Sequence, residues 1–161
     1  MGNGCCCVLS GSTTCENLLR NRAGVFHVFD NALLIAQTAI GIKLPPPACR
    51  GATSISGDVL ENCYKFFEFC VEEVEMEGER YHLHAQVVHH GQVGDFLGFN
   101  RAKHAVIEAA IIATRLHLLS PAEIPTELAR LQVIVDKTGG PEEHEAMALL
   151  RKYCHQHGID L

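Results

Sequence analysis

The hydrophobic pattern changes its period along the chain, and it predicts strands in the first half and helices in the second. Apolar and polar residues alternate over 66–76 and 80–88, which is typical of two strands. Gly78-Glu79 between them suits a tight hairpin turn. From position 100 onward apolar residues recur every three or four positions, as in amphipathic helices. The chain is therefore predicted to be an α+β protein.

A two-residue turn fixes which residues face each other across the expected hairpin. The predicted pairs are Val74 with Leu83, Met76 with Tyr81, Glu75 with His82 and Glu73 with His84. The first two pairs are apolar and the other two place a carboxylate beside an imidazole. Both combinations stabilise antiparallel strands, so we expect this register unless a bulge shifts it.

Shorter elements with local start signals precede the hairpin. Thr13 and a glutamate three residues later fit a capping box, which predicts a helix over 13–22. A second helix is expected over 32–40, with Asp30 or Asn31 as its N-cap. The first half of the chain therefore mixes strands with two short helices.

The second half is expected to hold three helices in a row. Asn100 is a good N-cap for a helix over 101–119. Ser120-Pro121 followed by a glutamate forms a complete start signal for the next helix, and Pro141 starts the last one. These signals predict a helical C-terminal subdomain.

Composition limits the classes of function that remain open. The chain has 161 residues and a net charge of −6, and it has no basic runs, which argues against nucleic-acid binding. Its apolar stretches are too short to span a membrane. Its eight cysteines lack the dense spacing of a secreted disulfide scaffold, so a cytoplasmic protein is expected. We predict two domains, 1–95 and 96–161.

The strongest local signal for an anion is Ser12-Thr13-Thr14 at a predicted helix start. Amides in the first turn of a helix lack intrahelical acceptors, and the helix dipole favours a negative group there. Asn17 lies one turn further along and can point the same way. The pattern fits a phosphate site, and it also fits ordinary helix capping, which is the more common role of these residues.

His82 and His84 are the candidates for metal binding, because residues two apart on a strand share a face. Glu73 or Glu75 could stand beside them. The alternative is a solvated strand face on which histidines meet glutamates. The sequence fixes no third ligand, so we assign no metal site.

The segment around the first C-terminal helix is the most distinctive stretch of the chain. Asn100, His104 and Glu108 fall at four-residue spacing, and Arg101 and Lys103 place cations at a helix start, where the dipole disfavours them. This arrangement indicates either an acidic ligand or a surface helix whose glutamate compensates the charge. Asn100, Arg101 and His104 are therefore candidates to face a ligand.

The same stretch, residues 96–111, closely resembles the signature of the domain-of-unknown-function family 447. Further matching pieces are Gly24–Val28, Thr114–Leu119 and Lys137–Pro141, and the likeness runs from about Ser12 to Tyr153. The resemblance implies a flavin-reductase-like split β-barrel that binds FMN, followed by a helical C-terminal domain. Family members carry further strands before this point, so the resemblance implies an incomplete barrel and a shortened N-terminus.

The resemblance also implies a site and a function. In this family a Ser/Thr-rich segment with a Thr-Tyr-x-Asn pattern receives the FMN phosphate, which maps onto Ser12, Thr13, Thr14 and Asn17. Cys15 stands here in place of the usual tyrosine. The expected function is that of an FMN-binding protein of unknown substrate, either a flavin-dependent oxidoreductase or a flavin-binding homodimer. The alternative is a non-enzymatic interaction module that has lost flavin binding through the short N-terminus.

Overall fold

The structure is a computed structural model that describes residues 3–9, 11–96 and 98–161. The chain forms two compact units, one of Met1–Phe29 and Pro47–Phe96 and the other of Asp30–Pro46 and Leu97–Leu161. A single division after residue 95 was expected. The structure instead groups the segment Asp30–Pro46 with the helices of the second unit, although it precedes residue 95.

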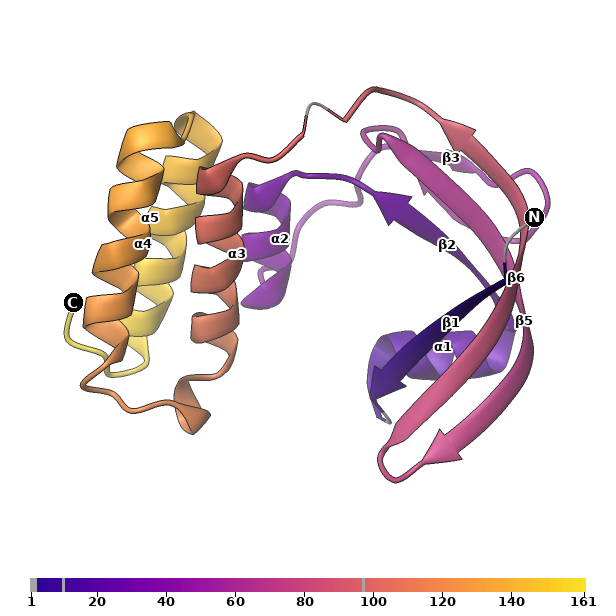
Figure 1. The fold of residues 1–161 in the computed structure, drawn as a ribbon, viewed down its shortest axis with the longest axis horizontal. Coiled ribbons are helices and arrows are strands. Elements are labelled where there is room, and N and C mark those ends of the chain that lie inside the picture. The colour runs from indigo at the N-terminus through magenta and orange to yellow at the C-terminus, as the bar shows by residue number, and fades with distance from the viewer. Residues whose placement is uncertain (1–2, 10, 97) are drawn as a thin grey trace. The chain divides into compact units, whose positions relative to one another are not determined.

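The first unit is built on a four-stranded antiparallel sheet with the order β1-β6-β5-β2 (Figure 1). The strands are β1 (Asn3–Leu9), β2 (Ala23–Val28), β5 (Lys65–Glu77) and β6 (Arg80–Gln92). A separate ribbon pairs β3 (Cys49–Gly51) with β4 (Asp58–Leu60). The barrel, which was expected to be incomplete, is not closed: within the described residues β1 and β2 are the two edges of an open sheet.

The long hairpin has the predicted register. Val74 lies opposite Leu83 and Met76 opposite Tyr81, and the two glutamate–histidine pairs are also as expected. The register shifts between Glu68 and Phe69 and again between Val71 and Glu73. Because both shifts lie beyond these four pairs, they leave the predicted end of the hairpin intact.

Helix α1 (Thr13–Asn21) packs on this sheet through Leu18, which forms a small core with Val71 and Leu83. Its N-cap is Ser12, whose Oγ accepts the Cys15 amide at 3.2 Å. The predicted cap at Thr13 was therefore one residue too late, since Thr13 is already helical. Arg22 ends the helix in the left-handed region, with φ at 54°.

The second unit contains four α-helices among the residues that the structure describes, so the expected three-helix subdomain is one helix short. These helices are α2 (Ala32–Ala39), α3 (Arg101–Thr114), α4 (Ile124–Thr138) and α5 (Pro141–Gln156). The additional helix is α2, whose Ala32 and Ala36 are buried in the same core as the other three. Small side chains on α2 and α3 allow this close packing.

Two helix boundaries differ from the predictions. α3 ends at Thr114 and is followed by a 3₁₀ turn over Leu116–Leu118, so the expected helix over 101–119 is too long. α4 begins at Ile124, because the Glu123 amide bonds to the Ser120 carbonyl at 3.0 Å and closes a separate turn first. No helix among the described residues has both the length and the apolar character needed to cross a membrane.

Candidate functional site

The predicted phosphate-binding residues lie together at the start of α1. Thr13, Thr14 and Asn17 are exposed, and Ser12 is half-buried because its hydroxyl caps the helix. Thr13 and Asn17 are four residues apart and therefore lie on one face of the helix. The start of α1 thus presents hydroxyls and an amide to solvent, next to first-turn amides that lack intrahelical acceptors.

A cation lies one turn further along the same face and was missed in the sequence reasoning. The Nη2 atom of Arg20 donates to Oδ1 of Asn17 at 2.7 Å. The spacing of Thr13, Asn17 and Arg20 follows the helical period, which is the signal that could have found the arginine. Thr13, Asn17 and Arg20 thus form an exposed stripe on α1, in which Arg20 carries a positive charge and the other two side chains are neutral.

Two neighbouring residues complete the local environment of this stripe. Cys15, which stands at the position of the family's tyrosine, is 1% exposed, so its thiol is not presented to solvent. Glu16 is exposed in the first turn and opposes the binding of an anion there. The hydroxyls, the helix start and Arg20 still fit a phosphate, while Glu16 lowers the affinity to be expected.

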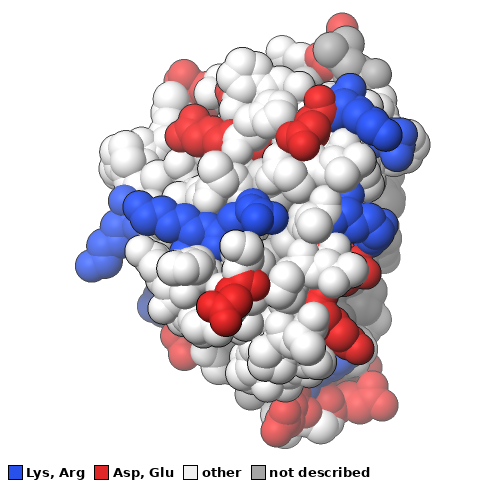
Figure 2. Space-filling view, turned by 90° about the vertical axis from the view of Figure 1, so that its left-hand side faces the viewer, with Lys and Arg blue, Asp and Glu red and all other residues white. Residues whose placement is uncertain are grey.

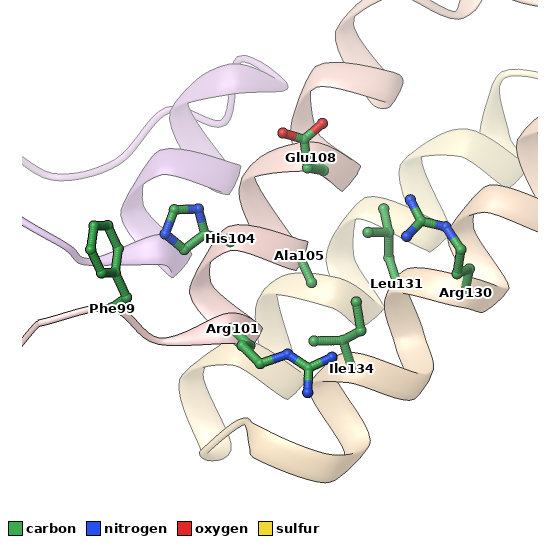
Figure 3. Close-up of a pocket in the computed structure, with 8 residues that line it drawn as sticks. All are labelled: Phe99, Arg101, His104, Ala105, Glu108, Arg130, Leu131 and Ile134. Carbon is green, nitrogen blue, oxygen red and sulfur yellow. The ribbon is translucent and has the colours of Figure 1, made fainter.

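A groove between α3 and α4 contains the second set of predicted residues. Its cavity volume is about 250 Å³, and its floor is apolar, formed by Ala105, Leu131 and Ile134. Figure 3 shows Arg101 extending from the start of α3 toward Ile134. His104 lies beside Phe99, with ring centroids 5.7 Å apart. Arg101 and His104 therefore both face this groove.

The rim of the groove carries charge of both signs. Arg101 and Arg130 are the arginines of the lining, and Arg130 also pairs with Glu127 at 2.9 Å. Glu108 is the acidic residue of the lining. Arg130, contributed by α4, could not be placed here from sequence, because its position depends on how two helices pack.

Asn100 is used differently from Arg101 and His104. Its Oδ1 accepts hydrogen bonds from the backbone amides of Ala102 at 2.8 Å and Lys103 at 3.2 Å, so the side chain caps α3. Asn100 does not line the groove. The Lys103 ammonium lies 2.5 Å from the Asp30 carboxylate, within the same unit. The unfavourable cation at this helix start is therefore partly neutralised by the segment before α2.

Across the hairpin, His82 and His84 face Glu75 and Glu73, as the predicted register requires. The Nε2 atom of His82 lies 3.3 Å from a carboxylate oxygen of Glu77. Within the described parts of the chain, no three histidine, cysteine or acidic residues are grouped so as to hold a metal ion. His82 therefore interacts with an acidic residue of the neighbouring strand, and His84 lies opposite Glu73.

Glu68 is a fully buried carboxylate in the first unit. Its two oxygens accept the backbone amides of Thr53 at 2.8 Å and Ser54 at 2.6 Å. Burial raises the pKa of Glu68. The amide hydrogen bonds and the nearby His89 lower it by more than burial raises it, so the pKa lies below its ordinary value. Glu68 thus holds the loop between β3 and β4 as a charged acceptor.

Charged side chains are mixed on the face of the molecule in Figure 2. Lysines and arginines lie across the middle of this face, and acidic residues lie above and below them. The chain as a whole carries a net charge of −6. Interspersed signs of this kind give the face no extended positive field.

Comparison with solved structures shows the fold most clearly for an FMN-bound protein from Methanosarcina mazei. The two chains are 20% identical with a TM-score of 0.79, and the match covers 92% of this chain and 80% of that one. That protein is assigned to the family DUF447. At this level of identity the similarity establishes the fold alone.

Two other solved structures are much less similar. A nitrilotriacetate monooxygenase component B homologue from Mycobacterium thermoresistibile is 11% identical with a TM-score of 0.49, and the match covers 58% of this chain and 54% of that one. An FMN-binding protein from Thermus thermophilus is 14% identical with a TM-score of 0.47, and 56% and 54% of the two chains are covered. This chain spans only about half the length of these two proteins, and nothing is carried over from them.

No curated protein sequence matches the chain. Family models match most of it, as the resemblance in the first C-terminal helix predicted. The model described as the N-terminal domain of "Protein of unknown function (DUF447)" matches residues 7–93, and a second model, "Protein of unknown function (DUF447)", matches residues 100–152. The chain therefore belongs to the DUF447 family of proteins of unknown function.

Proposed function

We propose that this protein binds FMN and holds its phosphate at the start of α1. The observation that carries the proposal is the exposed stripe of Thr13, Asn17 and Arg20, with Ser12 and Thr14 beside it. Phosphates bind well where first-turn amides, hydroxyls and a cation converge. The FMN bound to the Methanosarcina family member supports the same ligand for this chain.

The residues of the stripe would contribute in different ways. The hydroxyls of Thr13 and Thr14 and the amide of Asn17 donate hydrogen bonds to phosphate oxygens, and Arg20 adds a charge-assisted contact. Ser12 keeps its capping role and so holds the first turn in place. When bound, FMN supplies the redox chemistry, while the protein supplies binding and orientation. We infer a flavin-dependent oxidoreductase whose substrate is undetermined.

Comparing FMN with riboflavin tests the phosphate site, because the two ligands differ only in the phosphate. In isothermal titration of the full chain we expect FMN to bind at least about tenfold more tightly than riboflavin. Replacing Thr13 and Thr14 together by alanine should reduce that ratio to about threefold or less, because the hydroxyl donors are lost.

The matched control is Thr126→Ala, which removes an exposed threonine from α4 and should leave the ratio unchanged. Circular dichroism confirms that each variant is folded. Equal affinity for FMN and riboflavin in the native chain would place the phosphate elsewhere. A folded, colourless protein that takes up neither ligand would favour the alternative, a flavin-free interaction module.

We also propose that the flavin-binding form is a homodimer. The sheet has two edges within the described residues, and an unpaired edge is commonly covered by another chain. Light scattering on the samples of the same titration tests this, since a dimer should appear at twice the chain mass of 17.6 kDa. A monomer that is fully loaded with FMN contradicts the proposal.

The groove between α3 and α4 is the proposed contact for an acidic group of a ligand, made by Arg101 and His104. Its apolar floor and its arginines suit a molecule with a carboxylate on an apolar body. A carboxylate such as benzoate should shift the backbone amide signals of the first two turns of α3, from Arg101 to Glu108, in the native chain and not in Arg101→Gln. Identical shifts in both proteins would remove Arg101 from the site.

A further inference from the structure

A second pocket of the helical unit lies where α3 and α5 end. Its cavity volume is about 400 Å³, and it lies between the last turns of the two helices and the 3₁₀ turn. Leu116 and Ile159 contribute apolar surface to it, and His117, Tyr153 and His157 contribute polar groups. A cavity that combines apolar surface with a few convergent polar atoms is a common form of small-molecule site.

His157 has its hydrogen-bonding pattern fixed by the backbone. Its Nδ1 atom lies 2.8 Å from the Tyr153 carbonyl oxygen. A carbonyl can only accept, so Nδ1 carries the hydrogen, and in the neutral ring Nε2 is left as an acceptor. The imidazole also stacks on the Tyr153 ring, with centroids 4.1 Å apart and planes 31° apart. The imidazole is therefore held in one orientation, and its Nε2 lone pair is accessible because His157 is exposed.

The electrostatics of the pocket favour a positive ligand. The carboxyl-terminal ends of α3 and α5 both border it, and helix dipoles place partial negative charge at these ends. The aromatic ring of Tyr153 attracts cations through its π-electrons. None of the described residues lining the pocket is Lys, Arg, Asp or Glu, and the flanking Arg115 and Asp160 are of opposite sign.

We propose that this pocket binds a small organic ammonium ion, with Nε2 of His157 accepting from the ammonium group. Leu116 and Ile159 would contact the apolar body of the ligand. An organic cation suits the site better than a metal ion, because no group of three metal-ligating residues occurs within the described residues. This site is independent of the proposed flavin site, which depends on residues of α1.

Benzylammonium is the probe that tests the charge requirement. Added to the full chain, it should shift the amide NMR signals of Thr114, His117 and His157 with a dissociation constant in the millimolar range. Benzyl alcohol, which has the same ring without the charge, should bind at least about fivefold more weakly. Benzoate should not bind here, and binding of benzoate as tight as that of benzylammonium would overturn the proposal.

Two variants test the assigned acceptor. His157→Phe keeps a ring over Tyr153 but lacks the lone pair, and it should weaken benzylammonium binding by about tenfold. His155→Phe, on the exposed last turn of α5 outside the pocket, is the matched control and should bind like the native chain. Should His157→Phe not fold, His157→Leu, which also lacks an acceptor, serves instead. Native affinity in a folded His157 variant, or displacement of the probe by stoichiometric Zn²⁺, would overturn the proposal.

Discussion

A single buried carboxylate, Glu68, determines how the loop between β3 and β4 is held. Its two oxygens each accept one backbone amide, from Thr53 and Ser54. The carboxylate is fully buried while Thr53 and Ser54 are exposed, so these hydrogen bonds are partly buried and are made to a charged acceptor. Loss of either oxygen would remove the charged acceptor of one of these two amides, which lowers the stability of the folded chain.

Replacing Glu68 by glutamine tests this role, because glutamine offers one acceptor oxygen where the carboxylate has two. We expect Glu68→Gln to lower the free energy of unfolding by about 2–3 kcal/mol in urea titrations. The matched control is Glu72→Gln, an exposed residue of the same strand, which should change stability by less than about 0.5 kcal/mol. Equal stability of both variants and the native chain would contradict the account.

The pH dependence of the same variant follows from the lowered pKa of Glu68. A carboxyl group whose pKa is depressed on folding contributes stability that is fully present above its unfolded value, here 4.5, and is lost as pH falls through the lower folded value. The native chain should therefore lose stability below about pH 4.5 more steeply than Glu68→Gln does. Parallel curves for the two proteins would show that Glu68 does not titrate with a lowered pKa.

At the scale of elements, helix ends account for much of the local order, and two of them depend on one side chain each. Ser12 caps α1 and Asn100 caps α3, in each case by accepting first-turn amides. Asn100 also lies next to the groove residue Arg101, which made it a candidate ligand contact in sequence. Its two amide hydrogen bonds assign it to the helix instead.

Asn100→Ala and Asn100→Asp distinguish capping from ligand contact. Alanine removes the acceptor, so the free energy of unfolding should fall by about 1 kcal/mol, measured by urea denaturation. Aspartate is as good a cap as asparagine and should retain most of the native stability, although Asp cannot donate to a ligand. If both substitutions leave the unfolding free energy unchanged, the cap does not stabilise α3.

The elements that the sequence could predict are those set by local geometry. A two-residue turn at Gly78-Glu79 determined the register of β5 and β6 as far as Glu73 and His84, because the pairs between the turn and the first bulge follow from the turn. β3 and β4 were missed, since each is only three residues long and has no alternating pattern to detect. The helix start predicted at Ser120-Pro121 was too early, because the same residue types begin an isolated turn and the first turn of a helix.

At the scale of the whole chain, long-range packing decided what local patterns could not. α2 belongs to the helical unit because Ala32 and Ala36 are buried against α3 and α5. The local hydrophobic pattern of α2 does not indicate which elements it packs against. The strand order of the open sheet likewise depends on pairing between strands that are far apart in the sequence, such as β1 with β6. The family assignment was predictable because the signature around α3 is long and local. The stripe on α1 was found in part, and Arg20 was added only by the structure.

The most direct test of the central claim is the stoichiometry of FMN on the full-length, folded chain. Equilibrium dialysis against FMN, read by flavin absorbance, should give one FMN per chain, released on denaturation. Replacing Arg20 by glutamine should weaken binding by about tenfold, because a charge-assisted contact to the phosphate is lost. No uptake of FMN by the folded native chain at millimolar concentration would contradict the account.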